Sequence, residues 1–333
     1  MTRRGIVWIV SILLILGCLS GCAGTGNTGS TTRPDVTEKQ ISVVATVFPA
    51  YDWARQIIGE DNPRVALTLL LDKGADLHSY QPTVEDIYKI STCDVFLYVG
   101  GASDKWVPDA LAQASNPRLN AVNLLETLGS AVKEEESVEG MEPEHEDPKP
   151  DDEPEYDEHV WLSLRFAQIL CRRIEAALEE ADPDGADAYH QNCAAYTQKL
   201  QELDRRYAEA LAAAPRKTLL FADRFPFRYL TDDYGLSYYA AFSGCSAETE
   251  ASFETVNFLV EKLDELGLPC VMKLEGSDGR LAETIIENSR AGDAQILELN
   301  SIQSVTAQGV EEGASYLGIM EQNLAVLQQA LGN

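Results

Sequence analysis

Long apolar runs are missing from most of this sequence. Beyond the N-terminal region, no stretch reaches the roughly eighteen apolar residues that a membrane-spanning helix requires. The sequence therefore gives no sign of further helices that would cross a membrane. Histidine is also scarce, with four in 333 residues, so each of them can be considered individually.

Basic residues are too few to balance the acidic ones. Lys and Arg total 26 against 54 Asp and Glu, which gives a formal net charge of −28. If an N-terminal leader containing Arg3 and Arg4 is removed, the charge becomes −30. Such a surface repels nucleic acid and anionic substrates, and it attracts cations.

Several chemical motifs are also absent. The sequence has no Cys-x-x-Cys, no His-Glu-x-x-His and no serine nucleophile elbow, which argues against a cysteine-only metal centre and against common hydrolases. Two of the seven cysteines lie in the N-terminal region. The other five are an odd number, and their pairing stays open: Cys93, Cys171, Cys193, Cys245 and Cys270.

The N-terminus has the features of a lipoprotein leader. A positively charged start precedes the apolar run Gly5–Leu16, which is too short to span a bilayer, and the sequence Leu-Ser-Gly-Cys ends at Cys22. Residues 1–21 are therefore predicted to be a signal peptide, Cys22 to carry a lipid, and residues 22–38 to be a flexible tether. We expect the mature chain outside a bacterial cell membrane, anchored by lipid alone.

An acidic segment interrupts the first half of the chain. Fourteen Asp or Glu lie between Glu134 and Glu158, with one lysine and one histidine, His145. Such a segment buries too little apolar surface to fold, so residues 134–156 are predicted to form a disordered loop. We expect it to collect cations weakly rather than to hold them.

The rest of the chain alternates apolar strands with helices, a pattern typical of parallel α/β sheets. In the first half, strands are predicted at 41–47, 65–71 and 94–99, with helices at 50–59 and 83–92. In the second half, strands are predicted at 218–222, 270–274 and 295–299, with helices at 253–265, 279–289 and 314–331. About 310 mature residues fit two domains better than one core.

A long helix is predicted between the two halves, over residues 186–213. Its apolar residues recur at intervals of three or four, which places them in one continuous stripe: Tyr189, Cys193, Tyr196, Leu200, Leu203, Tyr207 and Leu211. A helix of this length is a rod of roughly forty ångströms.

Two histidines stand in distinctive settings. His78 lies in GADLHSYQPT, residues 74–83, directly after an apolar strand. Its imidazole would project from the carboxyl edge of a sheet, where open α/β folds bind ligands. His159 lies in DEHVWL, residues 157–162, beside an aromatic side chain.

Together these segments resemble the zinc and manganese solute-binding proteins of ABC importers, whose motifs run close to D-P-H-S-Y-E-P-T-P and D-x-H-V-W-L. The resemblance extends over essentially the whole mature chain. It implies two α/β lobes, residues 39–185 and 214–333, whose parallel sheets are joined by the rigid helix 186–213. It also implies a metal site with His78 and His159 as ligands.

The third ligand of the family departs from its pattern here. Relatives have a histidine or glutamate in a segment such as H-D-A-F-G-Y-F, and this chain has ADRFPFRYL, residues 222–230. An ungapped alignment places Arg224 at the ligand position, and a guanidinium cannot bind a cation. If Pro226 is an inserted residue, Asp223 takes that position, and we favour Asp223. The alternative is that this carboxylate pairs with a nearby arginine.

The fourth ligand departs as well. Relatives end a late strand with aspartate, whereas the strand 295–299 ends in Asn300. A neutral amide oxygen suits harder cations than zinc, so water or Glu275 could complete the site instead. With these alternatives open, the predicted metal ligands are His78, His159, Asp223 and Asn300.

The resemblance implies a receptor and not an enzyme. It would capture Zn²⁺ between its lobes, with Mn²⁺ as the alternative, and deliver it as a monomer to the permease and ATPase of an ABC importer. Imidazole favours zinc, and carboxylate shifts the preference toward manganese. Two other functions stay open: a binding protein for a different solute and, with less support, a zinc-dependent hydrolase that activates water.

Overall fold

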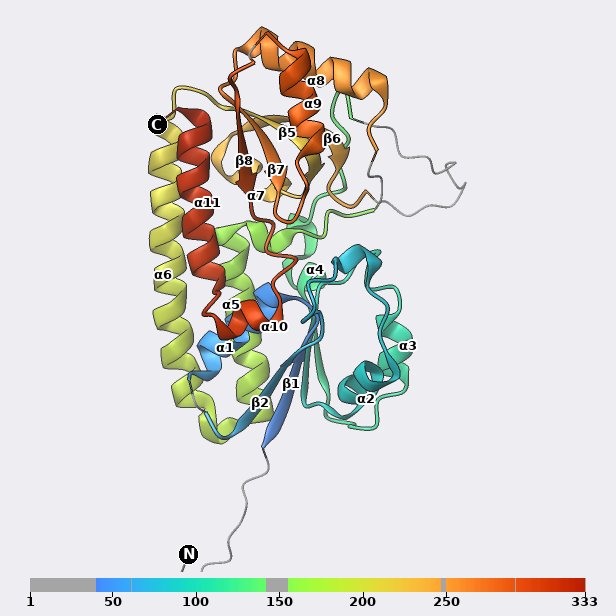
Figure 1. Cartoon of the computed structure of the whole chain (residues 1–333). Helices are drawn as coiled ribbons and strands as arrows, with labels where there is room; N and C mark the ends of the chain where they lie inside the picture. Colours follow the sequence, from blue (N-terminus) through green and yellow to red (C-terminus); the bar gives the residue numbers. More distant parts are fainter. Residues whose placement is uncertain (1–39, 61, 142–154, 247–249, 291, 333) are drawn as a thin grey trace, which may run out of the picture. The chain divides into compact units, whose positions relative to one another are not determined.

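The computed structural model (Figure 1) describes residues 40–60, 62–141, 155–246, 250–290 and 292–332. In this part of the chain, no helix combines the length and the apolar character needed to span a membrane. The predicted signal peptide, the tether and Cys22 lie outside the described residues.

The first lobe contains a four-stranded parallel sheet in the order β2-β1-β3-β4. The strands are β1 (Ile41–Ala45), β2 (Val65–Leu69), β3 (Val95–Tyr98) and β4 (Asn120–Asn123). β1 lies inside the sheet, and its residues Val43 and Ala45 have no exposed surface. This burial explains why β1 reads as a nearly continuous apolar run.

Helices cover this sheet on both faces. α1 (Phe48–Ile58) and α5 (Leu164–Ala181) pack together against it, and α2 (Val84–Thr92) packs with α3 (Val107–Ala112). A short helix, α4 (Leu124–Leu128), follows β4. α2 begins at a reciprocal capping box, because Thr83 and Asp86 each bond the other's backbone N–H.

The second lobe contains another four-stranded parallel sheet, with the strand order β6-β5-β7-β8. Its strands are β5 (Thr218–Phe225), β6 (Ser237–Ser243), β7 (Cys270–Leu274) and β8 (Gln295–Leu299). The helices α8 (Phe253–Leu266) and α9 (Arg280–Asn288) cover one face and share a separate apolar core with it. Helix α7 (Arg228–Tyr234) follows β5.

The long helix α6 (Ala186–Ala213) has the predicted bounds and runs alongside both lobes. Its apolar stripe is buried. Near its start, Asn192 donates from Nδ2 to the carbonyl of Ile57 in the first lobe, at 3.1 Å. Near its end, the hydroxyl of Tyr207 donates to the carbonyl of Met320 in the second lobe, at 2.6 Å. The predicted architecture of two α/β lobes joined by one long helix is therefore confirmed.

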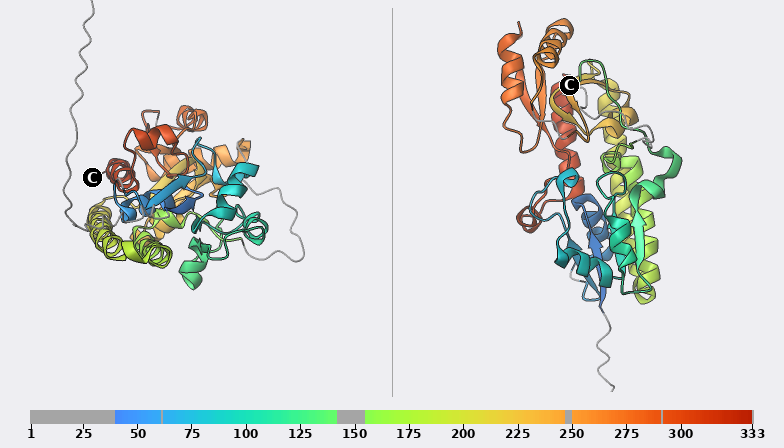
Figure 2. Two further views of the ribbon diagram at one scale, coloured as in Figure 1. Left: turned by 90° about the horizontal axis from the view of Figure 1, so that it is seen from below. Right: turned by 90° about the vertical axis from the view of Figure 1, so that its right-hand side faces the viewer.

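The C-terminal segment adds a second connection between the lobes. After β8 the chain returns to the first lobe through α10 (Ala307–Glu311), and α11 (Tyr316–Leu331) then runs beside α6 (Figure 2). The buried carboxylate of Asp52 in α1 accepts the backbone N–H of Tyr316 at 2.8 Å and binds Arg55 at 2.5 Å. This contact fixes the start of the last helix on the first lobe.

The ends of the predicted acidic loop are ordered. Glu134 and Tyr156 form an antiparallel bridge, and the N–H of Glu135 donates to the carbonyl of Glu155 at 2.8 Å. Met141 is buried. Because pairing and burial hold both ends of the acidic segment, the prediction of disorder is wrong for residues 134–141 and 155–156. Residues 142–154 lie outside the described part of the chain.

The carboxylate of Asp52 is expected to contribute to stability because it pairs with the partly exposed Arg55 and accepts the first backbone N–H of α11. Asp52→Ala leaves the backbone N–H of Tyr316 without its acceptor and leaves Arg55 with the carbonyl of Ala314, so it should lower the free energy of unfolding by about 1–3 kcal/mol. Denaturant unfolding of the purified chain measures this. Asp184→Ala removes a carboxylate that is 84% exposed and should change it by less than about 0.5 kcal/mol. Equal effects of the two changes would show that the buried contacts of Asp52 do not contribute to stability.

Candidate metal site

His78 stands in a short 3-10 helix, Leu77–Ser79, which follows β2 at the carboxyl edge of the first sheet. Asp76 caps this turn, because its Oδ1 accepts the backbone N–H of His78 at 2.9 Å. The Nδ1 of His78 lies 2.8 Å from the hydroxyl of Ser103 and 3.5 Å from Oε2 of Glu158. The backbone and one ring nitrogen of His78 are thus held by the protein.

His159 is completely buried at the start of a second 3-10 helix, Val160–Leu162. Oδ1 of Asp157 accepts both its backbone N–H, at 2.8 Å, and its Nδ1–H, at 2.9 Å. The indole of Trp161 packs edge-on against the ring, with 5.3 Å between centroids. One carboxylate therefore fixes both the position and the tautomer of this imidazole.

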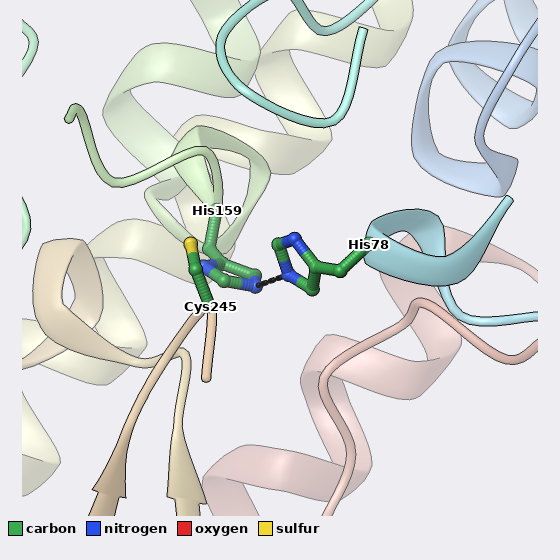
Figure 3. A group of neighbouring side chains, drawn as sticks. All are labelled: His78, His159 and Cys245. Carbon is green, nitrogen blue, oxygen red and sulfur yellow. Dashed lines mark hydrogen bonds between the residues drawn. The ribbon is translucent and has the colours of Figure 1, made fainter. Parts of the chain in front are cut away.

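The two histidines meet through their remaining nitrogens. Nε2 of His78 lies 3.3 Å from Nε2 of His159 (dashed line in Figure 3), and the ring planes are tilted by 59° to each other. In a tetrahedral site with metal–nitrogen bonds of about 2.0–2.1 Å, two ligand nitrogens stand about 3.3–3.4 Å apart. The pair therefore already has the separation that a shared zinc ion requires.

Burial and neighbouring charges shift the pKa values of the two histidines and of Glu158. Burial and the neighbouring ring of His159 lower the pKa of His78 to about 4. Burial opposes the charged form of His159 too, but Asp157 outweighs it and the pKa of His159 is raised. Burial also raises the pKa of Glu158 to about 7. The first histidine is consequently neutral at physiological pH, as a metal ligand must be.

A third donor comes from the second lobe. Cys245 lies just beyond β6, and its sulfur groups with ring nitrogens of His78 and His159 within 4.8 Å (Figure 3). Gly244 allows this approach, since a Cβ at that position would lie 2.9 Å from the carbonyl of Phe225 and 3.2 Å from the His159 ring. The backbone N–H of Cys245 donates to Oε1 of Glu135 at 2.9 Å.

The sequence analysis missed Cys245 as a ligand and treated it only as one of five cysteines whose pairing stayed open. All five are free thiols, and Cys245 is the one among them that is not fully buried. A signal was present: Ser-Gly-Cys-Ser follows an apolar strand, which places the thiol at the carboxyl edge of the second sheet, where ligands bind. That strand, β6, was absent from the prediction.

Asp223 is not brought to the histidine pair. In the pairing of β5 with β6, Phe221 faces Ala240 and Arg224 faces Phe242, so β5 carries one extra residue between them. The irregularity lies here and not at Pro226. The Asp223 carboxylate accepts the N–H of Arg224 at 2.9 Å and that of Leu274 at 3.2 Å. It is therefore engaged by the backbone of its own sheet.

Arg224 has a different role from a ligand. Its Nη2 lies 2.6 Å from Oδ2 of Asp76, the residue that caps the turn of His78. Burial opposes ionisation of Asp76, but Arg224 outweighs it and the pKa of Asp76 is lowered. The guanidinium at the family's ligand position thus ties the second lobe to the turn that presents His78.

Asn300 and Glu275 are also engaged elsewhere. Oδ1 of Asn300 accepts the N–H of Ile302 at 2.7 Å and so shapes the turn after β8. Ile302 has a φ of 65°, a strained conformation for a β-branched residue. The two carboxylate oxygens of Glu275 accept the hydroxyl and the N–H of Ser301, at 2.6 and 2.7 Å. Neither side chain joins the histidine pair.

A cleft of about 910 Å³ opens between the lobes beside His78. Its lining from the second lobe includes Asp223, Arg224 and Glu275. Of the three donors, His78 lines this cleft.

The family model described as "Zinc-uptake complex component A periplasmic" matches residues 43–330. The chain belongs to this family. The family is one of solute-binding receptors.

Individual relatives agree with this assignment. The chain is 30% identical over 294 residues to the zinc-binding lipoprotein AdcA of Streptococcus pneumoniae, covering 87% of this chain and 56% of that protein. It is 28% identical over 323 residues to the high-affinity zinc uptake system protein ZnuA of Bacillus subtilis, covering 96% and 97%. The chain thus spans about half the length of the AdcA proteins and nearly all of ZnuA.

A solved structure shares the fold. The Zn(II)-bound ZnuA-like domain of S. pneumoniae AdcA is similar with a TM-score of 0.68 and 28% identity. The match covers 88% of this chain and 100% of that domain.

The contact between Asp157 and His159 is expected to strengthen metal binding by orienting the ring. Asp157→Asn removes the charge and should weaken binding of zinc or cadmium roughly 10- to 100-fold. Competition with a fluorescent chelator measures this. Asp182→Asn changes a carboxylate that binds Arg64 and Tyr189 far from the pair, and it should leave the affinity unchanged. Wild-type affinity in Asp157→Asn would show that the carboxylate does not support the site.

Proposed function

We propose that this protein is a lipid-anchored receptor that captures a zinc ion between its two lobes and delivers it to the permease and ATPase of an ABC importer. The capture site is His78, His159 and Cys245. The observation that carries this proposal is the pair of Nε2 atoms at 3.3 Å, each on a ring whose Nδ1 is already bonded within the protein. Membership in the zinc-uptake family supports the same cargo.

The donor set favours zinc over manganese. Two imidazoles and a thiolate are borderline or soft ligands, which suit Zn²⁺, whereas Mn²⁺ prefers carboxylate and water. Sequence reasoning kept Mn²⁺ as the alternative because it took Asp223 and Asn300 as the remaining ligands. With a thiol in their place, the preference moves further toward zinc.

The origin of the ligands supports capture between lobes. His78 and His159 belong to the first lobe and Cys245 to the second. An ion bound by all three would hold the lobes together, and loss of the Cys245 contact would open the site. Delivery to a permease would therefore require only a small separation of the second lobe from the histidines.

The anchoring part of the proposal rests on the sequence Leu-Ser-Gly-Cys that ends at Cys22. Lipid attachment there would keep the receptor at the outer face of the membrane, beside its permease. The name of the S. pneumoniae relative, a lipoprotein, supports this placement.

Zinc binding is expected to depend on all three donors. His78→Ala, His159→Ala and Cys245→Ser each remove one ligand and should lower the affinity by orders of magnitude, since each lost zinc bond costs on the order of several kcal/mol. Chelator competition and elemental analysis of the purified full chain measure this.

The matched control for these variants is His190→Ala, which removes an exposed histidine on α6 that pairs with Glu175. It should retain one tightly bound zinc. Asp223→Ala should also retain it. Tight binding in Cys245→Ser together with its loss in Asp223→Ala would return the third ligand to Asp223.

The acidic sequence outside the described residues is expected to raise the local concentration of cations without holding them. Replacing residues 142–154 with a neutral linker of equal length removes seven carboxylates and His145. Attraction by such charges is screened over about 8–10 Å at physiological salt. Stopped-flow measurements should show slower zinc association at low ionic strength and nearly unchanged affinity. A large loss of affinity would mean that the segment supplies a ligand.

A further inference from the structure

A second group of metal-binding side chains lies away from the cleft, on the helices α5 and α6. α5 ends at Ala181, the short turn Pro183–Gly185 follows, and α6 begins at Ala186. The two helices pack side by side as a helical hairpin (Figures 1 and 2). Residues that are about equally far from the turn on either side therefore meet across the hairpin.

Three possible metal donors meet across this hairpin. Glu175 and Glu179 are one turn apart on α5, so their side chains leave the same face of that helix. His190 comes from the second turn of α6, and its Nδ1 lies 2.7 Å from Oε1 of Glu175. One donor atom from each of the three residues lies within 4.8 Å of the other two. We call Glu175, Glu179 and His190 the hairpin cluster.

The hairpin cluster gathers more negative charge than its partners balance. Among the ion pairs of the described residues, Glu175 pairs with His190, and Glu179 pairs with no basic side chain. Arg172 lines the same hollow of about 350 Å³ as Glu175 and His190, but in the described part of the chain it forms no ion pair with either glutamate. Two carboxylates this close repel each other, and a divalent cation between them would remove that repulsion.

The backbone that carries the cluster is fixed by packing on both helices. Leu178 of α5 and Tyr189 of α6, each next to a cluster residue in the sequence, are completely buried. The hydroxyl of Tyr189 donates to Asp182 in the turn at 2.8 Å, and Asn192 ties the same stretch of α6 to the first lobe. An ion bound by the cluster would therefore have to order only three side chains, which keeps the entropic cost of binding small.

We propose that the hairpin cluster is a second zinc site, separate from the site between the lobes and not dependent on the capture function proposed above. In a tetrahedral site with bonds of about 2.1 Å to nitrogen and oxygen, two donors stand about 3.4 Å apart, so Nδ1 of His190 and Oε1 of Glu175 need to part by less than about 1 Å. The imidazole then carries its hydrogen on Nε2, Glu179 is the third ligand, and water fills the fourth position. Because His190 is 73% exposed and water remains bound, this site binds zinc more weakly than the site between the lobes and fills second.

The test uses the purified full chain, stripped of metal and labelled with nitrogen-15 at histidine. Since the chain has four histidines, their ring signals in NMR spectra can be assigned by single substitutions. Zinc chloride is then added stepwise. We expect the first equivalent to shift the ring signals of His78 and His159, and a second equivalent to shift those of His190. Chelator competition measures the affinity of the first site separately, so a failure of the proposed function and a failure of this inference can be told apart.

Glu175→Gln and Glu179→Gln each remove one donor of the cluster. Each should raise the zinc concentration at which the His190 signals shift by about 10-fold or more, without changing the affinity of the first site. Glu180→Gln is the matched control, because it makes the same change of charge on α5 at a carboxylate that accepts the side-chain amide of Asn120 instead, at 2.7 Å. It should match wild type. The acidic residues 142–154 are present in every form, so cations collected there affect all of them equally. Circular dichroism establishes that each metal-free variant is folded.

Three results would overturn the inference. Ring signals of His190 that stay unchanged in a large excess of zinc would show that no ion binds at the hairpin. The same response in Glu179→Gln, Glu180→Gln and wild type would show that the zinc near His190 is attracted by general negative charge and not held by three donors. A His190 response that disappears in His78→Ala would show that the two sites are not separate, whereas a wild-type response in that variant supports the second site.

Discussion

The site depends on one constraint: two buried imidazoles must present their Nε2 lone pairs to the same point. This arrangement is unfavourable unless every other polar atom of the rings is satisfied, because buried unpaired groups are costly. Asp157 satisfies Nδ1 of His159, and Ser103 satisfies Nδ1 of His78. The protein thereby leaves only Nε2 of each ring for an ion. Partners at the outer nitrogens of this kind generally strengthen metal binding by orienting the ligand rings.

Contacts between the lobes hold the segments that carry the two histidines in position. Arg224 binds Asp76, and the indole N–H of Trp161 donates to the carbonyl of Ser301 at 2.8 Å. The hydroxyl of Tyr316 donates to the carbonyl of Trp161 at 2.6 Å. Each contact joins a segment next to a histidine with the second lobe or the C-terminal helix. Together with α6, they favour small movements of the lobes over a wide opening, which fits a cargo as small as a single ion.

Much of the fold was predictable because its elements have strong local patterns. The helix at 186–213 and the strands at 270–274 and 295–299 have the predicted bounds. In the helix, the apolar residues recur at the spacing of one buried face, and the two strands are short, mostly apolar runs. β4, β6 and α5 were missed. β4 is only four residues long and begins and ends with asparagine, and β6 is identified as a strand through its pairing with β5. Such elements are defined by their neighbours more than by their own sequence.

The sequence by itself determined the family, the two lobes and the two histidines, because short motifs with fixed chemistry carry that information. The second half of the site required the tertiary structure. A one-residue bulge in β5 turns Asp223 onto the backbone, and Arg224 pairs with Asp76, a residue 148 positions away. Cys245 lies close enough to act as a donor only because β6 ends beside His159, and its backbone N–H donates to Glu135, 110 positions away. Distances between residues far apart in the chain are set by packing, and no local pattern records them.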